Sequence, residues 1–266
     1  MVYLLFNSFS EVFLVFVLTF YLAWIIGIED DYYNYRRRLE ARKKEPRRQF
    51  IKTICMALIA IPVIFFQIGD SEISIYFFNL ELGIFYWFFI VPLGVTTASN
   101  CTNLLAGLNG LEVGLGFLYT LFFGIILINE STELAILMFI FSGSLLGLLI
   151  FNTFPAKIFP GDSTTLVIGA VIAVVSVMSN LVWLAIFILL LPVLEFFVTL
   201  RVRFNAENFG EITERGTLRS PQTIQSLTHV IMRQGDFTEK EVVRIFWFLQ
   251  LIIGILSIIL YEIFYI

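Results

Sequence analysis

Charged residues are scarce in this 266-residue chain, and their scarcity excludes an ordinary water-soluble domain. Only 14% of the residues are charged, whereas 59% are apolar and 17% are aromatic. The mean hydropathy is +0.90, and soluble domains carry about 25% charged residues. Apolar stretches of roughly 20 residues, the length that a helix needs to cross a bilayer, recur along almost the whole sequence. We therefore predict a single integral membrane domain over residues 1–266.

Cysteine and histidine are also nearly absent. Cys55 falls within an apolar stretch and Cys101 in a polar connection, so the two cysteines indicate neither a disulfide nor a metal cluster. His229 is the single histidine, and because the sequence shows no partner for it, we expect a structural role. A period of about 20 to 50 residues, which would indicate a repeat protein, is missing as well.

The apolar stretches predict an all-α protein, a polytopic bundle of about eight transmembrane helices. The expected spans cover residues 9–29, 50–68, 83–99, 113–129, 133–153, 164–179, 181–200 and 245–264. The first stretch differs from a secretory signal peptide because it is long, lacks a basic flank and shows no small-residue cleavage pattern before Asp30. We therefore expect it to be a permanent helix.

Lysine and arginine are concentrated in three segments. Nine of the 17 lie in residues 36–52, one is Lys157, and seven lie in residues 201–244. Eight spans place all three segments on one face, which the positive-inside rule identifies as cytoplasmic. We therefore expect both termini outside and cytoplasmic loops, forming the active-site face, at residues 30–49, 100–112, 152–163 and 201–244.

Two adjacent acids, Asp30 and Asp31, follow directly on the first expected span. Acidic residues at such a depth are rare and are usually functional. Neighbouring carboxylates attract a divalent cation, although they can also simply mark the end of a helix in water. The sequence thus indicates a candidate cation site at this boundary.

The connection at residues 99–116 reads SNCTNLLAGLNGLEVGLG and combines asparagine and glycine with hardly any charge. Glycine lets the backbone approach a ligand closely, and carboxamides provide donors and acceptors for a nucleobase or for hydrated magnesium. A simple turn between helices would not need so many of both. We interpret this connection as a ligand-binding loop.

A lone acid, Asp162, follows a helix-breaking Pro160-Gly161 pair in the segment FPAKIFPGDSTT. Two interpretations remain equally open. The Asp162 side chain could cap the helix that follows, or it could bind Mg²⁺, which takes one or two carboxylates and completes its shell with water and phosphate oxygens.

Arginine marks the start of the last cytoplasmic segment, where Arg201 and Arg203 follow a span. Two guanidiniums at the membrane surface suit phosphate oxygens, which arginine binds bidentately. For the basic run at residues 36–48 we favour the simpler interpretation of a positive-inside anchor.

Four blocks in this order resemble the polyprenyl-phosphate N-acetylhexosamine-1-phosphate transferases of glycosyltransferase family 4 type. The blocks are IEDDYYNYR, NCTNLLAGLNGLEVG, PAKIFPGD and RVRFN, and the resemblance covers the chain from about residue 20. The sequence LAGLNGLE is similar to that of the archaeal and eukaryotic UDP-GlcNAc:dolichyl-phosphate branch, since bacterial members usually have Asp at the positions of Ala106 and Asn109. The resemblance therefore favours dolichyl phosphate over undecaprenyl phosphate.

Carried over by position, the resemblance implies roles for individual residues. Asn103 and Asp162 would hold Mg²⁺, or Mn²⁺ in its place, and Asp30 and Asp31 would lie close by, with Asp30 nearest the lipid phosphate. Together with Asp162 these two acids form the expected catalytic group. The other residues that the resemblance places on the substrates are Gly107, Asn109 and Phe159 for uridine, Lys52, Arg201 and Arg203 for phosphates or sugar, and Asn34 as a further sugar contact.

Two departures from the resembled family bear on these expectations. The family has ten spans, and this chain begins at what would be the third, which leaves three explanations open: a misplaced start, helices supplied by another chain, or a truncated and inactive relative. In addition, bacterial members carry a histidine cluster where this chain has Arg201-Val202-Arg203. The second departure agrees with the dolichyl branch.

The expected reaction transfers N-acetylglucosamine 1-phosphate from UDP-GlcNAc to a polyprenyl phosphate at the cytoplasmic face and releases UMP, the first lipid-linked step of glycan assembly. The expected location is the cell membrane, of archaeal type rather than endoplasmic reticulum. Besides donor, acceptor lipid and membrane lipids we expect no nucleic acid partner, and a homodimer stays open. A transporter is the rival class, and Glu195, inside the seventh expected span, is the residue that it would use.

Overall fold

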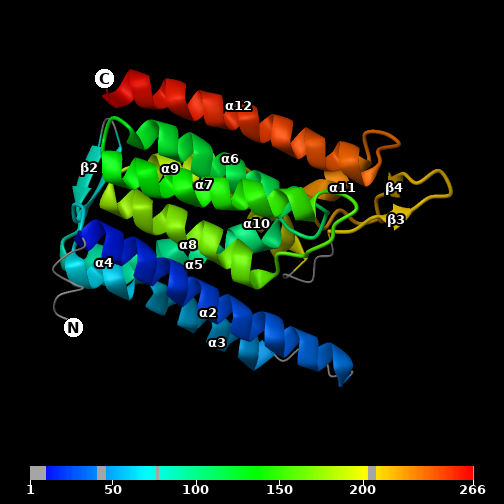
Figure 1. Cartoon of the computed structure of the whole chain (residues 1–266), viewed down its shortest axis with the longest axis horizontal. Helices are drawn as coiled ribbons and strands as arrows, with labels where there is room; N and C mark the ends of the chain where they lie inside the picture. The colour runs from blue at the N-terminus through cyan, green and yellow to red at the C-terminus, as the bar shows by residue number, and fades with distance from the viewer. Residues whose placement is uncertain (1–9, 41–45, 76–77, 203–207, 266) are drawn as a thin grey trace.

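Long helices lying side by side build most of the protein. A computed structural model describes residues 10–40, 46–75, 78–202 and 208–265. Figure 1 shows α12 along one edge of the bundle and α2 with α3 along the opposite edge, with α6, α7 and α8 between them. Both ends of the described chain and the β1–β2 hairpin lie at one end of the bundle, and α11 with the β3–β4 hairpin lies at the other. The expected helical class is confirmed.

Three helices are long and apolar enough to cross a membrane. They are α2 (Glu11–Leu39), α7 (Thr132–Asn152) and α12 (Glu239–Tyr265). A fourth candidate is the pair α9 (Val182–Ile188) and α10 (Leu190–Arg201), which passes the same test together but is bent by 71°. The described residues therefore contain three membrane-length helices, or four if the bent pair is one span.

Shorter apolar helices complete the bundle, and two of them, α6 and α8, are largely buried. One runs through Ile51–Phe66 and consists of most of α3 (Pro46–Ala57), the 3-10 turn η1 (Leu58–Ala60) and α4 (Ile61–Phe66). The others are α6 (Leu111–Leu127) and α8 (Asp162–Met178). The stretch expected at residues 83–99 forms the π-helical turn η2 (Tyr86–Ile90) followed by α5 (Val91–Leu104).

Two small antiparallel hairpins complete the described elements. Strands β1 (Glu72–Ile75) and β2 (Phe78–Glu81) pair with Glu72 opposite Glu81. Strands β3 (Glu211–Ile212) and β4 (Leu218–Arg219) pair with Glu211 opposite Arg219, and α11 (Leu227–Met232) follows them. The segment expected as a loop at residues 201–244 thus contains a hairpin and a helix.

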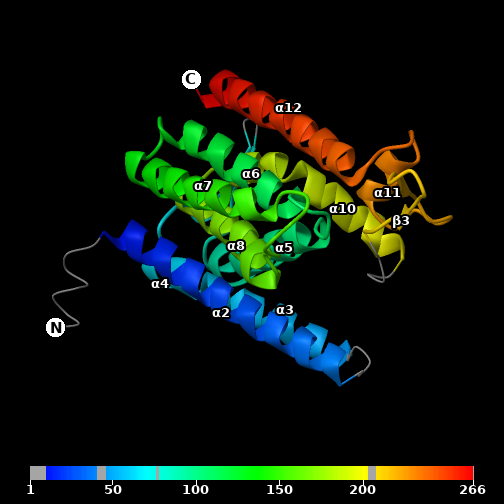
Figure 2. The same ribbon diagram turned by 45° about the vertical axis from the view of Figure 1, so that its right-hand side comes forward.

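Helix α2 continues ten residues past the end of the first expected span, so part of the expected loop at residues 30–49 is helical. The helix begins at an N-cap, Ser10, whose hydroxyl accepts from the Phe13 amide at 3.0 Å. Neither proline nor glycine interrupts residues 28–39, and arginines in the last turn complement the helix dipole. The carboxyl-terminal end of α2 thus extends past the apolar part of the helix, and Figure 2 shows this end projecting past α8.

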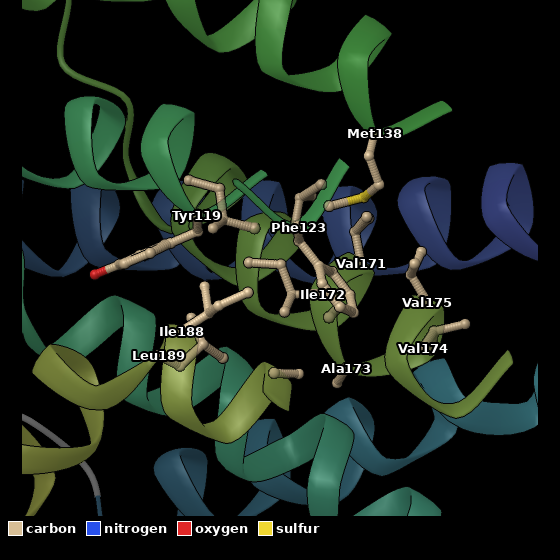
Figure 3. Close-up of a cluster of buried hydrophobic side chains, with 14 of the residues drawn as sticks. Tyr119, Phe123, Met138, Val171, Ile172, Ala173, Val174, Val175, Ile188 and Leu189 are labelled. Atoms are coloured by element: carbon tan, nitrogen blue, oxygen red, sulfur yellow. The ribbon is translucent and has the colours of Figure 1, made fainter. Parts of the chain in front are cut away.

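Helix α8 forms the centre of the bundle, and every residue from Thr165 to Met178 is buried. A helix that is apolar on all sides is typical of such a position. Figure 3 shows its Val171, Ile172 and Val175 among side chains from α6, α7 and α9, including Phe123. Because lipid tails are as apolar as leucine, close packing rather than the hydrophobic effect drives helix association within a bilayer. Small residues permit that packing.

Gly169 permits a close approach of α5 to α8 inside the core. A Cβ added at Gly169 would lie 2.4 Å from the carbonyl oxygen of Ala98, so α5 and α8 touch through their backbones. This contact brings the carboxyl-terminal end of α5 next to the amino-terminal end of α8. Asn103 and Asp162, which are far apart in sequence, therefore become neighbours.

Candidate active site

A cavity of about 740 Å³ opens where α2, α3, α5, α8 and α10 meet, at the end of the bundle that carries α11. Five of its lining residues recur along one face of α2 at helical spacing: Asp30, Tyr33, Asn34, Arg37 and Arg38. Residues three and four apart share a helix face. The carboxyl-terminal extension of α2 therefore forms one wall of the cavity.

Lys52 of α3 lies between two carboxylates inside this cavity. Its Nζ atom is 2.9 Å from Oδ2 of Asp30 and also bonds Oδ2 of Asp162. The Asn34 amide donates to the same Asp30 oxygen at 2.9 Å. The side chains of Lys52, Asp30 and Asp162 are only 16%, 12% and 22% exposed. The cluster is thus a largely buried group of two anions around one cation.

Asn103, near the end of α5, faces Asp162. Its Nδ2 donates to Oδ2 of Asp162 at 3.2 Å, and its Oδ1 accepts from the hydroxyl of Thr165 at 2.9 Å. Burial raises the pKa of Asp162, which precedes the expected span 164–179, to about 6, although the charge of Lys52 opposes the rise. The two residues that the resemblance assigns to a metal are therefore in direct contact.

Asp31 points away from the cavity, toward the backbone of α8. Its Oδ1 accepts from the Asp162 amide at 2.8 Å and its Oδ2 from the Ser163 amide at 3.0 Å. The residue before α8 is Gly161, which has no side chain to cap the helix. Of the two interpretations left open for Asp162, capping of its own helix is wrong, because Asp31 binds the free amides instead.

The expected ligand-binding loop is much shorter than the connection in the sequence, because α5 extends to Leu104 and α6 begins at Leu111. Gly107 and Gly110 have φ angles of +112° and +89°, a backbone region that favours glycine. Gly107 lines the cavity together with Ala106. The loop thus turns sharply at the edge of the cavity, and its role in binding a ligand stays a prediction.

Side chains from other elements hold the backbone of this loop, and the sequence alone did not reveal them. Nδ2 of Asn208 donates to the carbonyl oxygens of Leu104 at 2.7 Å and Ala106 at 2.5 Å. The Asn109 amide donates to Glu239 at 2.6 Å, and the Gly110 amide donates to Asn152 at 3.1 Å. The indole of Trp247 donates to the Gly110 carbonyl at 3.2 Å. The loop is therefore fixed from several sides.

Several expected contacts lie outside the lining of this cavity. Phe159 is 74% exposed, and Arg201 is an exposed residue at the end of α10. Asn109 is held through its backbone, as described above. Arg203 lies outside the described residues. The structure therefore brings together Asp30, Asn34, Lys52, Asn103, Gly107 and Asp162, and it places Asp31, Asn109, Phe159 and Arg201 around them rather than in the lining.

Arg37, Arg38 and Phe209 line the cavity but were not expected there. The two arginines belong to the basic run that we interpreted as a membrane anchor, and this interpretation is incomplete for them. Their signal was the helical spacing from Asp30, which becomes visible only when α2 is continued past residue 29. Phe209 covers Gly107, since a Cβ added there would lie 3.1 Å from its ring.

The donor set fits a hard divalent cation. Among the described residues no group of three or more His, Cys, Asp and Glu side chains could hold a metal. Mg²⁺ usually takes only one or two carboxylates and completes its shell with water and phosphate oxygens. Asp30 and Asp162 already share one cation, the ammonium of Lys52. Their negative potential and the carboxamide oxygen of Asn103 therefore suit Mg²⁺ bound together with substrate phosphates.

His229 is structural, in agreement with the sequence analysis. The residue is buried, and its Nδ1 accepts from the Gln225 amide at 3.2 Å. Its Nε2 lies 3.0 Å from the carbonyl oxygen of Phe209, so this nitrogen carries the proton. The ring thereby ties α11 to the segment that lines the cavity.

Comparisons with known proteins agree with this geometry. The family model described as glycosyl transferase family 4 matches residues 13–180. A Saccharolobus solfataricus protein, provisionally named UDP-N-acetylglucosamine–dolichyl-phosphate N-acetylglucosaminephosphotransferase, is 33% identical over 249 residues, which are 92% of this chain and 73% of the relative. A provisionally named glycosyltransferase of Methanocaldococcus jannaschii is 31% identical over 252 residues, 92% and 76% of the two chains.

A bacterial relative has a different printed activity. The phospho-N-acetylmuramoyl-pentapeptide-transferase of Listeria innocua is 32% identical over 247 residues, which are 91% of this chain and 72% of the relative. The family model covers more than half of the chain, and relatives from archaea and bacteria align along most of it. This chain belongs to glycosyl transferase family 4.

Proposed function

We propose that this protein transfers N-acetylglucosamine 1-phosphate from UDP-GlcNAc to a dolichyl-type polyprenyl phosphate and releases UMP. The observation that carries the proposal is the cavity in which Asp30, Asn34, Lys52, Asn103 and Asp162 meet. Family membership supports transfer of a phosphosugar to a lipid phosphate. The names of the archaeal relatives favour GlcNAc and dolichyl phosphate, as does the sequence LAGLNGLE at residues 105–112.

The chemistry is a single displacement at phosphorus. An oxygen of the lipid phosphate attacks the β-phosphorus of UDP-GlcNAc, the new P–O bond forms, and the bond to the UMP oxygen breaks. The lipid phosphate is already an anion near neutral pH, so no covalent enzyme intermediate and no obligatory base are required. The protein must hold two anions together and neutralise their charge.

Residues of the cavity supply that positioning. Lys52, Arg37 and Arg38 bring positive charge to one chamber, and arginine binds phosphate oxygens bidentately. Asp162 and Asn103 would hold Mg²⁺, which when bound neutralises charge on the pyrophosphate. Asp30, paired with Lys52, would lie nearest the lipid phosphate. Arg201, which lies outside the cavity lining, and Arg203, which lies outside the described residues, are proposed to bind phosphates or sugar.

The donor's uridine is proposed to bind at the loop of residues 105–110. Gly107 lines the cavity there, and Asn109 and Phe159 are proposed as further contacts, with Phe159 stacking on the uracil ring. The exposed ring of Phe159 is free to receive a planar base.

The placement in the membrane is also a proposal. Besides the three long helices and the bent pair, we propose that the apolar helices Ile51–Phe66, Leu111–Leu127 and Asp162–Met178, together with η2 and α5, cross the bilayer. Eight spans put the cavity on the cytoplasmic face of an archaeal-type cell membrane. The basic segments at residues 36–52 and 201–244 support this orientation.

Mg-dependent UMP release from UDP-GlcNAc and dolichyl phosphate, measured in detergent, tests the proposal. The chain is to be compared with a longer form that includes any upstream in-frame coding sequence. Activity of either form establishes the reaction. If both forms are folded but release no UMP while a positive control does, the protein is an inactive relative or uses another donor, and the proposal fails.

A matched pair of variants tests the assigned centre. Asp162→Ala is expected to lower UMP release at least about 100-fold, the cost of removing a charge-stabilising group from a transition state. Asp70→Ala, at the opposite end of the bundle, is expected to stay near wild-type activity. Near-normal Mg-dependent turnover by folded Asp162→Ala would rule out the assignment.

A further inference from the structure

Helix α8 begins without a capping side chain of its own. The first amides of a helix lack partners within the helix, and the preceding residue usually supplies the acceptor. At α8 that residue is Gly161, and the amides of Thr164 and Thr165 already bond its carbonyl oxygen at 3.2 and 3.3 Å. The amides of Asp162 and Ser163 are therefore the ones that need an acceptor.

Asp31 supplies that acceptor from a different helix. One carboxylate oxygen takes each amide, at 2.8 Å from Asp162 and 3.0 Å from Ser163. A negative charge at a helix amino terminus is favourable because of the helix dipole. Both oxygens of Asp31 are thus engaged with the backbone of α8, and neither faces the cavity.

Two glycines make this contact feasible. A Cβ added at Gly27, one turn before Asp31 in α2, would lie 2.4 Å from Cα of Ser163. A Cβ at Gly161, whose φ is +66°, would lie 2.5 Å from Oδ2 of Asp31. Any side chain at either position would push α2 and α8 apart. The approach of the two helices is therefore built into the sequence on both sides.

The consequence concerns the side chain of Asp162. An aspartate at a helix start commonly folds back to cap free amides. Because Asp31 already holds these amides, Oδ2 of Asp162 is directed to Lys52 and Asn103 instead. We infer that Asp31 is a positioning residue: it caps α8 from α2 and thereby keeps the Asp162 carboxylate directed into the cavity.

The inference rests on the proposed function in one respect, because that function is what makes the direction of the Asp162 carboxylate matter. The cap itself is a property of the fold and does not depend on the reaction. It differs from a role for Asp31 in binding metal or accepting a proton, since those roles need a carboxylate that faces the substrates. The two explanations make opposite predictions for an asparagine at this position. Asparagine is a good capping residue but carries no charge.

Hydrogen exchange of the purified enzyme, without metal or substrate, tests the cap directly. In Asp31→Ala the amides of Asp162 and Ser163 are expected to exchange at least about 10-fold faster, because both of their acceptors are lost. Asp31→Asn, which keeps one acceptor oxygen, is expected to lie in between. Gly27→Ala is expected to give the same local increase while leaving every carboxylate in place. Gly143→Ala, where an added Cβ meets nothing within 4 Å, is the matched control.

Turnover gives the second measurement. Asp31→Ala is expected to lower kcat/KM for UMP release about 100-fold, the cost of displacing a reacting group by about 1 Å, whereas Asp31→Asn is expected to lose about 10-fold. Equal, complete inactivity of Asn and Ala with unchanged exchange at residues 162–165 would overturn the inference and make Asp31 a direct participant.

The two proposals can fail separately. If exchange changes as expected but wild-type protein releases no UMP, the cap stands and the proposed function fails. If folded Asp31→Ala, judged by its elution profile and Tm, exchanges like wild type, the cap is wrong whatever the enzyme does. Gly27→Ala decides the matter if the Asp31 variants do not fold.

Discussion

At the scale of single residues, the site depends on how three charges are shared. Lys52 is held by two carboxylates in a setting where little solvent reaches any of the three side chains. Removing the cation would leave two like charges close together, and breaking a buried pair from one side commonly costs about 3–5 kcal/mol. Because these side chains are partly exposed, the cost here is smaller.

Lys52→Met is therefore expected to lower both the Tm and the activity. The loss in kcat/KM for UMP release should exceed about 100-fold, since the variant removes countercharge from the phosphates. Lys157→Met removes an exposed lysine that is absent from the cavity lining and should leave both quantities unchanged. Wild-type kcat/KM in folded Lys52→Met would exclude a role for the ammonium.

The raised pKa of Asp162 gives a prediction for stability without metal. Its folded-state pKa of about 6 lies above the ordinary aspartate pKa of 3.8, so the folded protein binds the proton more tightly than the unfolded chain. This contribution is fully present below the unfolded pKa and is lost as pH rises through about 6. In EDTA, the Tm of wild type should therefore fall relative to the Tm of Asp162→Asn as pH rises from about 5 to about 7. A constant difference would show that Asp162 is not buried as described.

At the scale of elements, the connection between α10 and α11 removes the strongest support for a transporter. Glu195 is fully buried in α10, and its Oε2 accepts from the Leu227 amide at the start of α11 at 2.7 Å. A buried acid with this partner attaches α11 to the bent helix pair. It marks a structural joint rather than a permeation path.

Glu195→Ala should accordingly destabilise the protein, while Glu195→Gln, which keeps an acceptor, should lose less. An unsatisfied buried amide costs about 1–3 kcal/mol, so a lower Tm is the expected result for Ala. Flux of UDP-GlcNAc into proteoliposomes, abolished by Glu195→Gln, would instead revive the transporter hypothesis.

The loop at residues 105–110 is held by the side chain of Asn208, so a substitution there should make the loop more mobile. Asn208→Ala removes both hydrogen bonds to the carbonyls of Leu104 and Ala106. KM for UDP-GlcNAc is expected to rise several-fold, with little change in KM for the lipid, since two hydrogen bonds are worth about 1–3 kcal/mol together. Asn180→Ala, which breaks the contact with Asp70 at the other end of the bundle, is the control. Equal changes in both KM values would contradict this role.

Much of the helical architecture could be predicted from hydropathy. Each feature that could not be predicted has a physical explanation. Helix α2 is longer than predicted because the apolar stretch ends at Glu29, whereas the residues up to Leu39 still favour a helix. Asp31 was grouped with Asp30, yet adjacent helix positions point about 100° apart, so one acid enters the cavity and the other meets α8. Phe209 and Asn208 follow from tertiary packing that sequence patterns do not encode.

At the scale of the whole molecule, orientation is the property that determines which compartment supplies the donor. The β3–β4 turn at Arg215 and the exposed turn at Asn129 lie at opposite ends of the bundle. In a background with Cys55 and Cys101 replaced, Arg215→Cys should resist a membrane-impermeant maleimide in intact cells, and Asn129→Cys should react. The reverse pattern would place the cavity outside and contradict the proposed reaction.

The length of α2 bears on which concentration of the lipid acceptor sets the reaction rate. Its 29 residues extend about 43 Å at 1.5 Å per residue, beyond a hydrocarbon layer of about 30 Å. Asp30 therefore lies just past the apolar part of the helix, at the depth of lipid head groups. The proposed lipid acceptor would then reach the cavity by lateral diffusion in the plane of the bilayer, whereas the proposed nucleotide donor would arrive from water. The rate should follow the mole fraction of polyprenyl phosphate among the lipids, so that adding inert lipid at constant bulk concentration slows the enzyme by surface dilution.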